Sequence, residues 1–226
     1  MKDYSVFDVI GPIMVGPSSS HTAGAVKLGK TAMELAAKNF YKVIFFLHGS
    51  FAKTYKGHGT DKALVAGILG FEPSDDRVKY SLEIAKSNNL IIEFCETEFE
   101  YAHPNTAKIE FHYLDSPVFY VIGSSIGGGN IVITNINGDD VEFTGQYPTI
   151  LLKYKDKKGM ISQISTILAS NEINIASMKV TRSNDLATFV CETDNIITDK
   201  AKEEILKIND INIAKFINPV RSWINV

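Results

Sequence analysis

Residues 149–182, TILLKYKDKKGMISQISTILASNEINIASMKVTR, decide the fold of the C-terminal part of the chain. The stretch begins with a strand over 149–156 and ends with a second strand over 173–182. Between them, apolar residues recur at the spacing of a helix face. These residues are Met160, Ile161, Ile164, Ile167 and Leu168. The stretch therefore predicts a β-α-β unit.

The residues that follow predict a second unit of the same kind. A turn at 183–185 leads into a strand over 186–194, and Thr198 or Asp199 is placed to cap a helix that carries Ala201, Ile205 and Ile208. A last strand is expected over 211–217. NEINIA at 171–176 and NDINIA at 209–214 form an internal echo, each entering a strand directly after a helix. Two related halves in the order β-α-β-β-α-β predict a ferredoxin-like sandwich.

The chain is predicted to hold two domains and to belong to the α+β class, with a mixed domain over 1–145 and the ferredoxin-like domain over 146–226. In the first domain, helices are expected over 23–38, 60–70 and 77–89, with a polar loop over 51–59. Strands are expected over 42–49, 90–96, 107–114, 118–123 and 130–140, with Asn137-Gly138 as a turn. The small residues Ala25, Gly29 and Ala32 imply that the first helix lies very close to a neighbour. The sequence gives no strand order.

Composition excludes several classes of protein. With 226 residues and 45% hydrophobic residues the chain can bury a core, and its net charge of -3 and pI of about 6.0 argue against a nucleic-acid or anionic-membrane binder. No apolar run approaches the roughly 20 residues of a spanning helix, and the start, with Asp3 and Asp8, does not resemble a signal peptide. We expect a cytoplasmic protein.

The two cysteines, Cys95 and Cys191, lie in predicted strands far apart in the sequence. Their spacing fits neither a disulfide framework nor a metal site, so two buried thiols are expected and no metal ligands are assigned. A cluster that takes roughly four cysteine ligands does not fit on this chain alone.

The first candidate site is the run Ser18, Ser19, Ser20, His21 and Thr22, directly before a predicted helix. Free N–H groups at a helix N-terminus, together with serine hydroxyls, suit a carboxylate or phosphate, and the positive end of the helix favours a neutral histidine able to act as a base. Simple N-capping by one serine is the alternative.

The second candidate site is AKTYKGHGTDKA over 52–63, where Lys53, Lys56, His58, Thr60 and Asp61 alternate with glycines. Lysine, histidine and aspartate can supply an anion contact and proton transfer, while glycine lets the backbone approach a ligand. The stretch is not a P-loop, because Asp61 stands where that motif has its second glycine. A solvated turn is the alternative.

The third candidate site combines HPNTAKI over 103–109, with His103 and Asn105, and GSSIGGGN over 123–130. The triple glycine leads from a strand into another strand, so a dinucleotide site, which needs a helix there, is excluded. A hairpin or bulge, with His103 and Asn105 as buried hydrogen-bonding residues, is the alternative.

Residues 153–182 resemble an ACT domain, a module that usually binds an amino acid and regulates an attached enzyme. Four residues match that family's pattern: Asp156, Gly159, Asn174 and Ile175. Gly159 would let backbone N–H groups at the helix start approach a carboxylate. The sequence departs from the pattern at Lys158, where proline is usual, and at Asp185, where glycine is common. A module used only for packing or for homodimer formation is therefore the alternative.

Taken with this ACT-like part, VFDVIGPIMVGPSSSHTAGA (6–25), HGSFAKTYKGHGTDKALVAGILGF (48–71), HPNTAKI and GSSIGGGNIVITNING (123–138) resemble the β chain of the iron-sulfur-dependent L-serine dehydratases. The resemblance covers nearly the whole chain in order. It implies an L-serine ammonia-lyase that forms pyruvate and ammonia without pyridoxal phosphate. It also implies a separate α chain that holds a [4Fe-4S] cluster, whose iron acts as Lewis acid on the substrate hydroxyl while a base removes the α-proton.

By this analogy the Ser18–Thr22 run faces the cluster of the α chain, with His21 as the first candidate for proton transfer. Ser19, Ser20 and Thr22 would orient the substrate. Lys53, His58 and Asp61 form a second catalytic set, as carboxylate contact, proton relay and orienter. The further substrate-binding candidates are Ser18, His103 and Asn105.

Two other functions fit parts of the sequence. A free-standing, non-catalytic amino-acid sensor would bind serine and need no partner. A transferase would use GPSSSHT and GSSIGGGN as phosphate sites, although no recognised nucleotide motif supports it.

Overall fold

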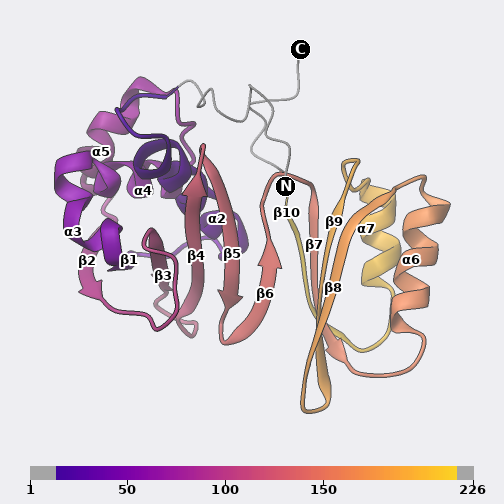
Figure 1. Ribbon diagram of the computed structural model, residues 1–226. Coiled ribbons are helices and arrows are strands. Elements are labelled where there is room, and N and C mark those ends of the chain that lie inside the picture. The colour runs from indigo at the N-terminus through magenta and orange to yellow at the C-terminus, as the bar shows by residue number, and fades with distance from the viewer. Residues whose placement is uncertain (1–13, 218–226) are drawn as a thin grey trace. The chain divides into compact units, whose positions relative to one another are not determined.

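The computed structural model describes residues 14–217, and its contacts divide them into two units, one up to Gly138 and one from Asp139 (Figure 1). Residues 6–13 of the first resemblance motif, and both ends of the chain, lie outside the described residues. Between residues 14 and 217, no helix combines the length and the apolar character needed to cross a membrane.

The N-terminal unit is mixed α and β, as predicted. Its helical segments are η1 (Ser19–Gly24), α2 (Ala25–Leu35), α3 (Gly49–His58), α4 (Thr60–Ile68), η2 (Asp76–Tyr80) and α5 (Ser81–Ser87). Its strands are β1 (Lys42–His48), β2 (Ile91–Thr97), β3 (Thr106–His112), β4 (Phe119–Gly127) and β5 (Asn130–Ile136). All four predicted strand regions that follow the helices are present.

The order of these strands within the unit is β2-β1-β3-β4-β5, which the sequence did not predict. β1 is parallel to β2 and antiparallel to β3. Three alternate side chains of β1, Val43, Phe45 and Leu47, are fully buried, as expected for a strand with one face in the core. The three glycines at 127–129 have positive φ angles and close the β4–β5 hairpin, so the simple hairpin interpretation of GSSIGGGN is confirmed.

The prediction of a polar loop over 51–59 is wrong, because this segment forms most of helix α3. Phe51 and Ala52 are buried, and the Tyr55 ring stacks on Phe94 at 5.5 Å between centroids. This packing stabilises a helix despite Gly57, which lies inside it. Gly59 (φ 69°) is the glycine that ends the helix, in the left-handed conformation typical of that position. Tertiary contacts thus outweigh local propensity here.

Two predicted helices differ from the structure at their ends. The helix expected over 23–38 starts earlier, as the π-helical turn η1, and stops at Leu35 because Ala36 is extended (φ -70°, ψ 155°). The helix expected over 77–89 consists of the 3₁₀ segment η2 followed by α5, and the Ser81 hydroxyl, at the junction, donates to the Lys62 carbonyl at 2.6 Å. The small-residue face of α2 makes the predicted close approach: it packs against α4.

The C-terminal unit has the predicted β-α-β-β-α-β order. Its elements are β7 (Thr149–Lys155), α6 (Met160–Ser170), β8 (Ile175–Ser183), β9 (Leu186–Thr193), α7 (Asp199–Leu206) and β10 (Ile211–Ile217). The strands form an antiparallel sheet in the order β10-β7-β9-β8, with α6 and α7 side by side over one face (Figure 1). Thr198 caps α7 as expected, since its hydroxyl accepts from Ala201 N at 3.2 Å.

One strand of this unit, β6 (Asp139–Phe143), has no counterpart in the sequence-based prediction. The Asn137-Gly138 turn before it is confirmed by positive φ angles at both residues. β6 packs against β9 and β8. Just after it, Thr144 donates from its backbone N and its hydroxyl to the buried Glu192 carboxylate, at 2.9 and 2.8 Å. Five residues with two leading aspartates carry too weak a pattern to predict a strand.

Candidate functional site

The polar run after Pro17 forms the start of a helix. Ser18 is extended (φ -130°, ψ 121°), and its hydroxyl accepts from the backbone N of His21 at 3.2 Å, so one serine does cap the helix. The following turn, η1, is π-helical and continues directly into α2. Single π-helical turns are rare and occur frequently at functional sites. The cap uses one serine and leaves the hydroxyl of Ser20 free for other contacts.

His21 lies at the centre of these contacts and is 8% exposed. Its Nδ1 lies 3.3 Å from the hydroxyls of both Ser18 and Ser20, and its Nε2 lies 3.2 Å from the hydroxyl of Ser50 on α3. The ring of His58, at the end of α3, stands edge-on at 4.9 Å between centroids. The first and second candidate sites of the sequence therefore meet at His21.

The surroundings of His21 favour its neutral form. Burial lowers the pKa of the His21 imidazole, and the nearby His58 lowers it further. The positive ends of two helices, the one that starts with η1 and α3, also lie next to the ring and disfavour a second positive charge. A buried neutral imidazole is a competent proton acceptor at neutral pH.

The third candidate site joins the same cluster from the ends of β3 and β4. The Ser125 hydroxyl donates to the Ser20 carbonyl at 2.9 Å, and the Ser125 backbone N donates to the Asn105 carbonyl at 3.0 Å. Asn105 Nδ2 donates back to the Ser125 carbonyl at 3.4 Å. A Cβ on Gly24 would lie 2.0 Å from the Ser125 hydroxyl, so glycine is required for η1 to approach β4 this closely.

The loop before β3 fixes the N-terminus of α3. The Pro104 carbonyl accepts from the backbone N of Ser50 at 2.7 Å and of Phe51 at 3.3 Å. Its neighbour His103 is exposed, and His103 Nδ1 accepts from Asn105 N at 3.1 Å. His103 and Asn105 therefore stabilise the loop that fixes the N-terminus of α3. Of the two, Asn105 is the one hydrogen-bonded to Ser125, which contacts the Ser20 carbonyl.

Not every predicted site residue contacts His21. Thr22 is buried and packs beneath Gly16, and its backbone N donates to the Ser18 carbonyl at 2.8 Å. Lys53 is exposed on α3, and Asp61 is half-buried in the first turn of α4. Burial raises the pKa of the Asp61 carboxyl, while the backbone N–H of Lys62, at 2.8 Å, acts in the opposite direction. None of the described hydrogen bonds joins Lys53 or Asp61 to the ring.

Two serines of the cluster were missed as candidates from the sequence, Ser50 and Ser125. The signal for Ser50 was its position directly after the buried strand 42–48 and Gly49, which places a hydroxyl on the first turn of a helix. The mistaken loop prediction for 51–59 concealed this signal. Ser125 could be found only from the strand order, because it lies 105 positions from its partner Ser20.

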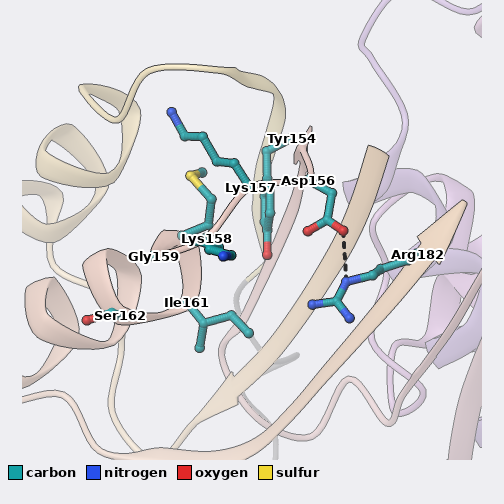
Figure 2. Close-up of a pocket in the computed structure, with 9 residues that line it drawn as sticks. Tyr154, Asp156, Lys157, Lys158, Gly159, Ile161, Ser162 and Arg182 are labelled. Carbon is teal, nitrogen blue, oxygen red and sulfur yellow. Dashed lines mark ion pairs between the residues drawn. The ribbon is translucent and has the colours of Figure 1, made fainter. Parts of the chain in front are cut away.

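The C-terminal unit separates its four predicted ligand residues. Asp156 and Gly159 line a hollow of about 180 Å³ at the start of α6, together with Lys158 and Arg182 (Figure 2). Asn174 and Ile175 line a wider hollow of about 400 Å³ at the end of α6, where Asn174 Nδ2 donates to Asp194 at 2.5 Å. The 11 residues of α6 span roughly 16 Å, so a small ligand cannot touch both hollows of one chain.

The hollow at the start of α6 has groups for both charges of an amino acid. The Asp156 carboxylate pairs with Arg182 Nε at 2.9 Å, as the dashed line in Figure 2 marks. Gly159 (φ 91°) precedes the first turn of α6, and no described side chain caps the N–H groups of that turn. A carboxylate could bind the helix end and an ammonium group Asp156.

The described residues do not fit an iron-sulfur cluster. No group of three or more His, Cys, Asp or Glu side chains within 14–217 could hold a metal ion. Cys95 on β2 is half-buried, in partial disagreement with the expected burial, and Cys191 on β9 is buried, which raises the pKa of its thiol to about 12. Since clusters bind thiolates, neither the number of these cysteines nor the raised pKa of the Cys191 thiol suits one.

Comparisons with known proteins agree with both parts of the structure. Residues 5–89 match the family model "Serine dehydratase beta chain", and residues 149–210 match the model "ACT domain". The L-serine dehydratase beta chain of Peptoniphilus asaccharolyticus is 50% identical over 220 residues, 96% of this chain and 99% of that relative.

Two further relatives place the chain more closely. The probable L-serine dehydratase beta chain of Bacillus subtilis is 42% identical over 218 residues, 95% of this chain and 99% of that relative. L-serine dehydratase 1 of Escherichia coli is 29% identical over 204 residues, which cover 77% of this chain and 44% of that relative. Identity of this extent over nearly the full length of two beta chains shows that the chain belongs to the family of L-serine dehydratase beta chains.

Proposed function

We propose that the chain is the β subunit of an L-serine dehydratase that converts L-serine to pyruvate and ammonia, and that it supplies part of an active site completed by an α chain. The observation that carries the proposal is the meeting of separate polar segments around one buried, neutral histidine, His21. The hydroxyls of Ser18, Ser20 and Ser50 contact its ring, and Ser125 joins them through the Ser20 carbonyl. A merely structural histidine does not need three serine hydroxyls around its ring.

The relatives support a two-chain enzyme. This chain matches 99% of the beta chain of Peptoniphilus asaccharolyticus, yet only 44% of L-serine dehydratase 1 of Escherichia coli. More than half of the longer relative therefore has no counterpart here. In our proposal a separate α chain takes its place and carries the [4Fe-4S] cluster, for which the described residues of this chain have no ligand set.

Each polar residue around His21 has a proposed task. His21 accepts the proton that leaves the substrate, since its ring is neutral and within reach of hydroxyl groups on both sides. Ser18, Ser19 and Ser20 bind and orient the substrate at the end of the helix, where N–H groups and the helix dipole favour its carboxylate. Exposed His58 is the group through which the proton leaves for solvent.

The test compares serine dehydratase activity, under anaerobic conditions, of this chain, of a cluster-bearing α chain, and of their mixture. We expect activity only in the mixture, and a loss of at least a hundredfold with His21→Ala, which removes a general base. His112→Ala is the matched control, since His112 lies at the far end of β3 and pairs with Glu110. Co-elution of both variants with the α chain shows that assembly is intact. An active mixture containing His21→Ala would refute the role of His21.

The hollow beside Gly159 supports a second proposal, that the C-terminal unit binds a small amino acid and regulates the enzyme. Titration calorimetry of the isolated chain with L-serine tests it, with Asp156→Asn to remove the ammonium partner and exposed Asp199→Asn as the control. Saturable binding that only Asp156→Asn abolishes is the expected result. If this chain binds serine and the α chain is fully active without it, the free-standing sensor is favoured.

A further inference from the structure

We infer that Ser50 is a positioning residue for His21: its hydroxyl donates to Nε2 and holds the ring in the neutral tautomer that carries its proton on Nδ1. For its catalytic meaning this rests on the proposed function, whereas the tautomer is a property of the chain alone. The Oγ–Nε2 distance of 3.2 Å is the contact that carries the inference.

Backbone contacts hold Ser50 in place. Its backbone N donates to the Pro104 carbonyl at 2.7 Å, and Phe51 N donates to the same oxygen at 3.3 Å. Pro104 can approach this closely because residue 49 is glycine: a Cβ there would lie 2.6 Å from the Pro104 oxygen. The hydroxyl of Ser50 therefore faces His21 from a fixed turn of α3, and not from a flexible loop.

The hydrogen-bonding groups on the two sides of the ring are unequal. Two hydroxyl oxygens, of Ser18 and Ser20, lie near Nδ1. The Ser18 oxygen accepts from the His21 backbone N and has a second lone pair for a proton on Nδ1. Near Nε2 there is one hydroxyl, and within residues 14–217 Nε2 is the one hydrogen-bond partner of the Ser50 side chain. A proton on Nδ1 and a lone pair on Nε2 satisfy both sides.

The dipole of α3 acts on the Nε2 side of the ring. Ser50 lies in the first turn of α3, a helix of 10 residues, where the potential is positive. A lone pair on Nε2 is stabilised by that potential, whereas an N–H pointing toward it is not. In this tautomer the ring atom able to accept a proton, Nε2, faces the N-terminus of α3.

The first experiment reads the tautomer directly. Nitrogen-15 NMR of the chain labelled at histidine distinguishes protonated from unprotonated ring nitrogens, and His21→Gln assigns the His21 signals among the five histidines. We expect protonated Nδ1 and unprotonated Nε2 in the wild type. Protonated Nε2 would overturn the inference, and the state that decides it is measured in the wild-type protein.

Variants then test the cause. Ser50→Ala removes the hydroxyl and is expected to mix the two tautomers and to raise the pKa of His21 by about half a unit to one unit, because a hydrogen bond to the neutral form is lost. Ser50→Thr keeps the hydroxyl and should restore both values. Ser87→Ala, an exposed serine on α5, is the matched control. An unchanged tautomer and pKa in Ser50→Ala would also overturn the inference.

Activity with the α chain separates this inference from the proposed function. If both hold, Ser50→Ala lowers kcat more than it changes KM and moves the acidic limb of the pH profile upward, and Ser50→Thr reverses the change. If NMR shows the expected tautomer but His21→Ala stays active in the mixture, the proposed function fails while the positioning of His21 by Ser50 stands. If instead NMR shows the proton on Nε2 while activity is lost in His21→Ala, the proposed function stands and the positioning of His21 by Ser50 fails.

Discussion

The crossing of α2 and α4 offers the sharpest prediction about the fold that positions His21. At this crossing glycine meets backbone on both sides: a Cβ on Gly29 would lie 2.3 Å from the Leu64 carbonyl oxygen, and one on Gly67 would lie 2.2 Å from the Val26 oxygen. A carbon atom needs roughly 3.5 Å of separation, so Gly29→Ala must push the helices apart by about 1 Å. α2 continues η1, and the shift therefore reaches His21.

The magnitude follows from two opposing contributions. Overpacking a buried contact costs about 1–3 kcal/mol, and the upper end applies because backbone atoms cannot rotate away. Alanine in place of glycine inside a helix stabilises the helix by about 1 kcal/mol. The net loss for Gly29→Ala is about 2 kcal/mol, or a fall of about 6 °C in the Tm of the N-terminal unit. Gly57→Ala is the control: its Cβ meets no atom within 4 Å, so its Tm should equal or exceed that of the wild type.

Thermal unfolding followed by circular dichroism measures the shift, and hydrogen exchange read by mass spectrometry assigns it to a unit. Exchange should accelerate in peptides from α2 and α4 of Gly29→Ala and stay unchanged in peptides from β7 and β9. A Gly29→Ala protein as stable as Gly57→Ala would refute the close crossing of the two helices.

Three further predictions concern single groups. Burial raises the pKa of Glu34 to about 7 in the folded state, so the contribution of this carboxyl to stability falls as pH rises from about 4.5 to 7. Glu34→Gln should therefore raise the Tm at pH 8, by the equivalent of about 1–2 kcal/mol, and change it little at pH 5. An equal effect at both pH values would contradict this. Gly24→Ala and Ser125→Ala should each lower the free energy of unfolding by about 1–2 kcal/mol. The double variant should lose less than the sum, because the added Cβ and the Ser125 hydroxyl compete for one space. Strict additivity in thermal melts would contradict that contact. A thiol reagent at neutral pH should modify Cys95 rapidly and Cys191 only on unfolding, and rapid modification of both in the native protein would contradict the burial of Cys191.

The C-terminal fold followed from local pattern. The apolar spacing from Met160 to Leu168, the cap at Thr198 and the repeated NEINIA and NDINIA segments were enough to predict the six elements from β7 to β10 in order, though not β6. Each of these signals acts within one element, and the β-α-β-β-α-β order admits few arrangements. The mistaken loop at 51–59 shows the limit of such reasoning, because the helix there depends on packing of Phe51 and Tyr55 against residues far away in sequence.

The sequence by itself determined which residues are candidates for the chemistry: the polar runs at 18–22, 52–63 and 103–109 and the two cysteines are visible without coordinates. Only the tertiary structure decided which of them meet. Ser50 and Ser125 approach the Ser18–His21 turn, whereas Lys53 and Asp61 make no described hydrogen bond to it. Likewise Asp156 and Asn174 belong to one motif but to opposite ends of α6. The reason is physical: residue type is a local property, whereas a site depends on strand order and helix crossings, which long-range burial selects.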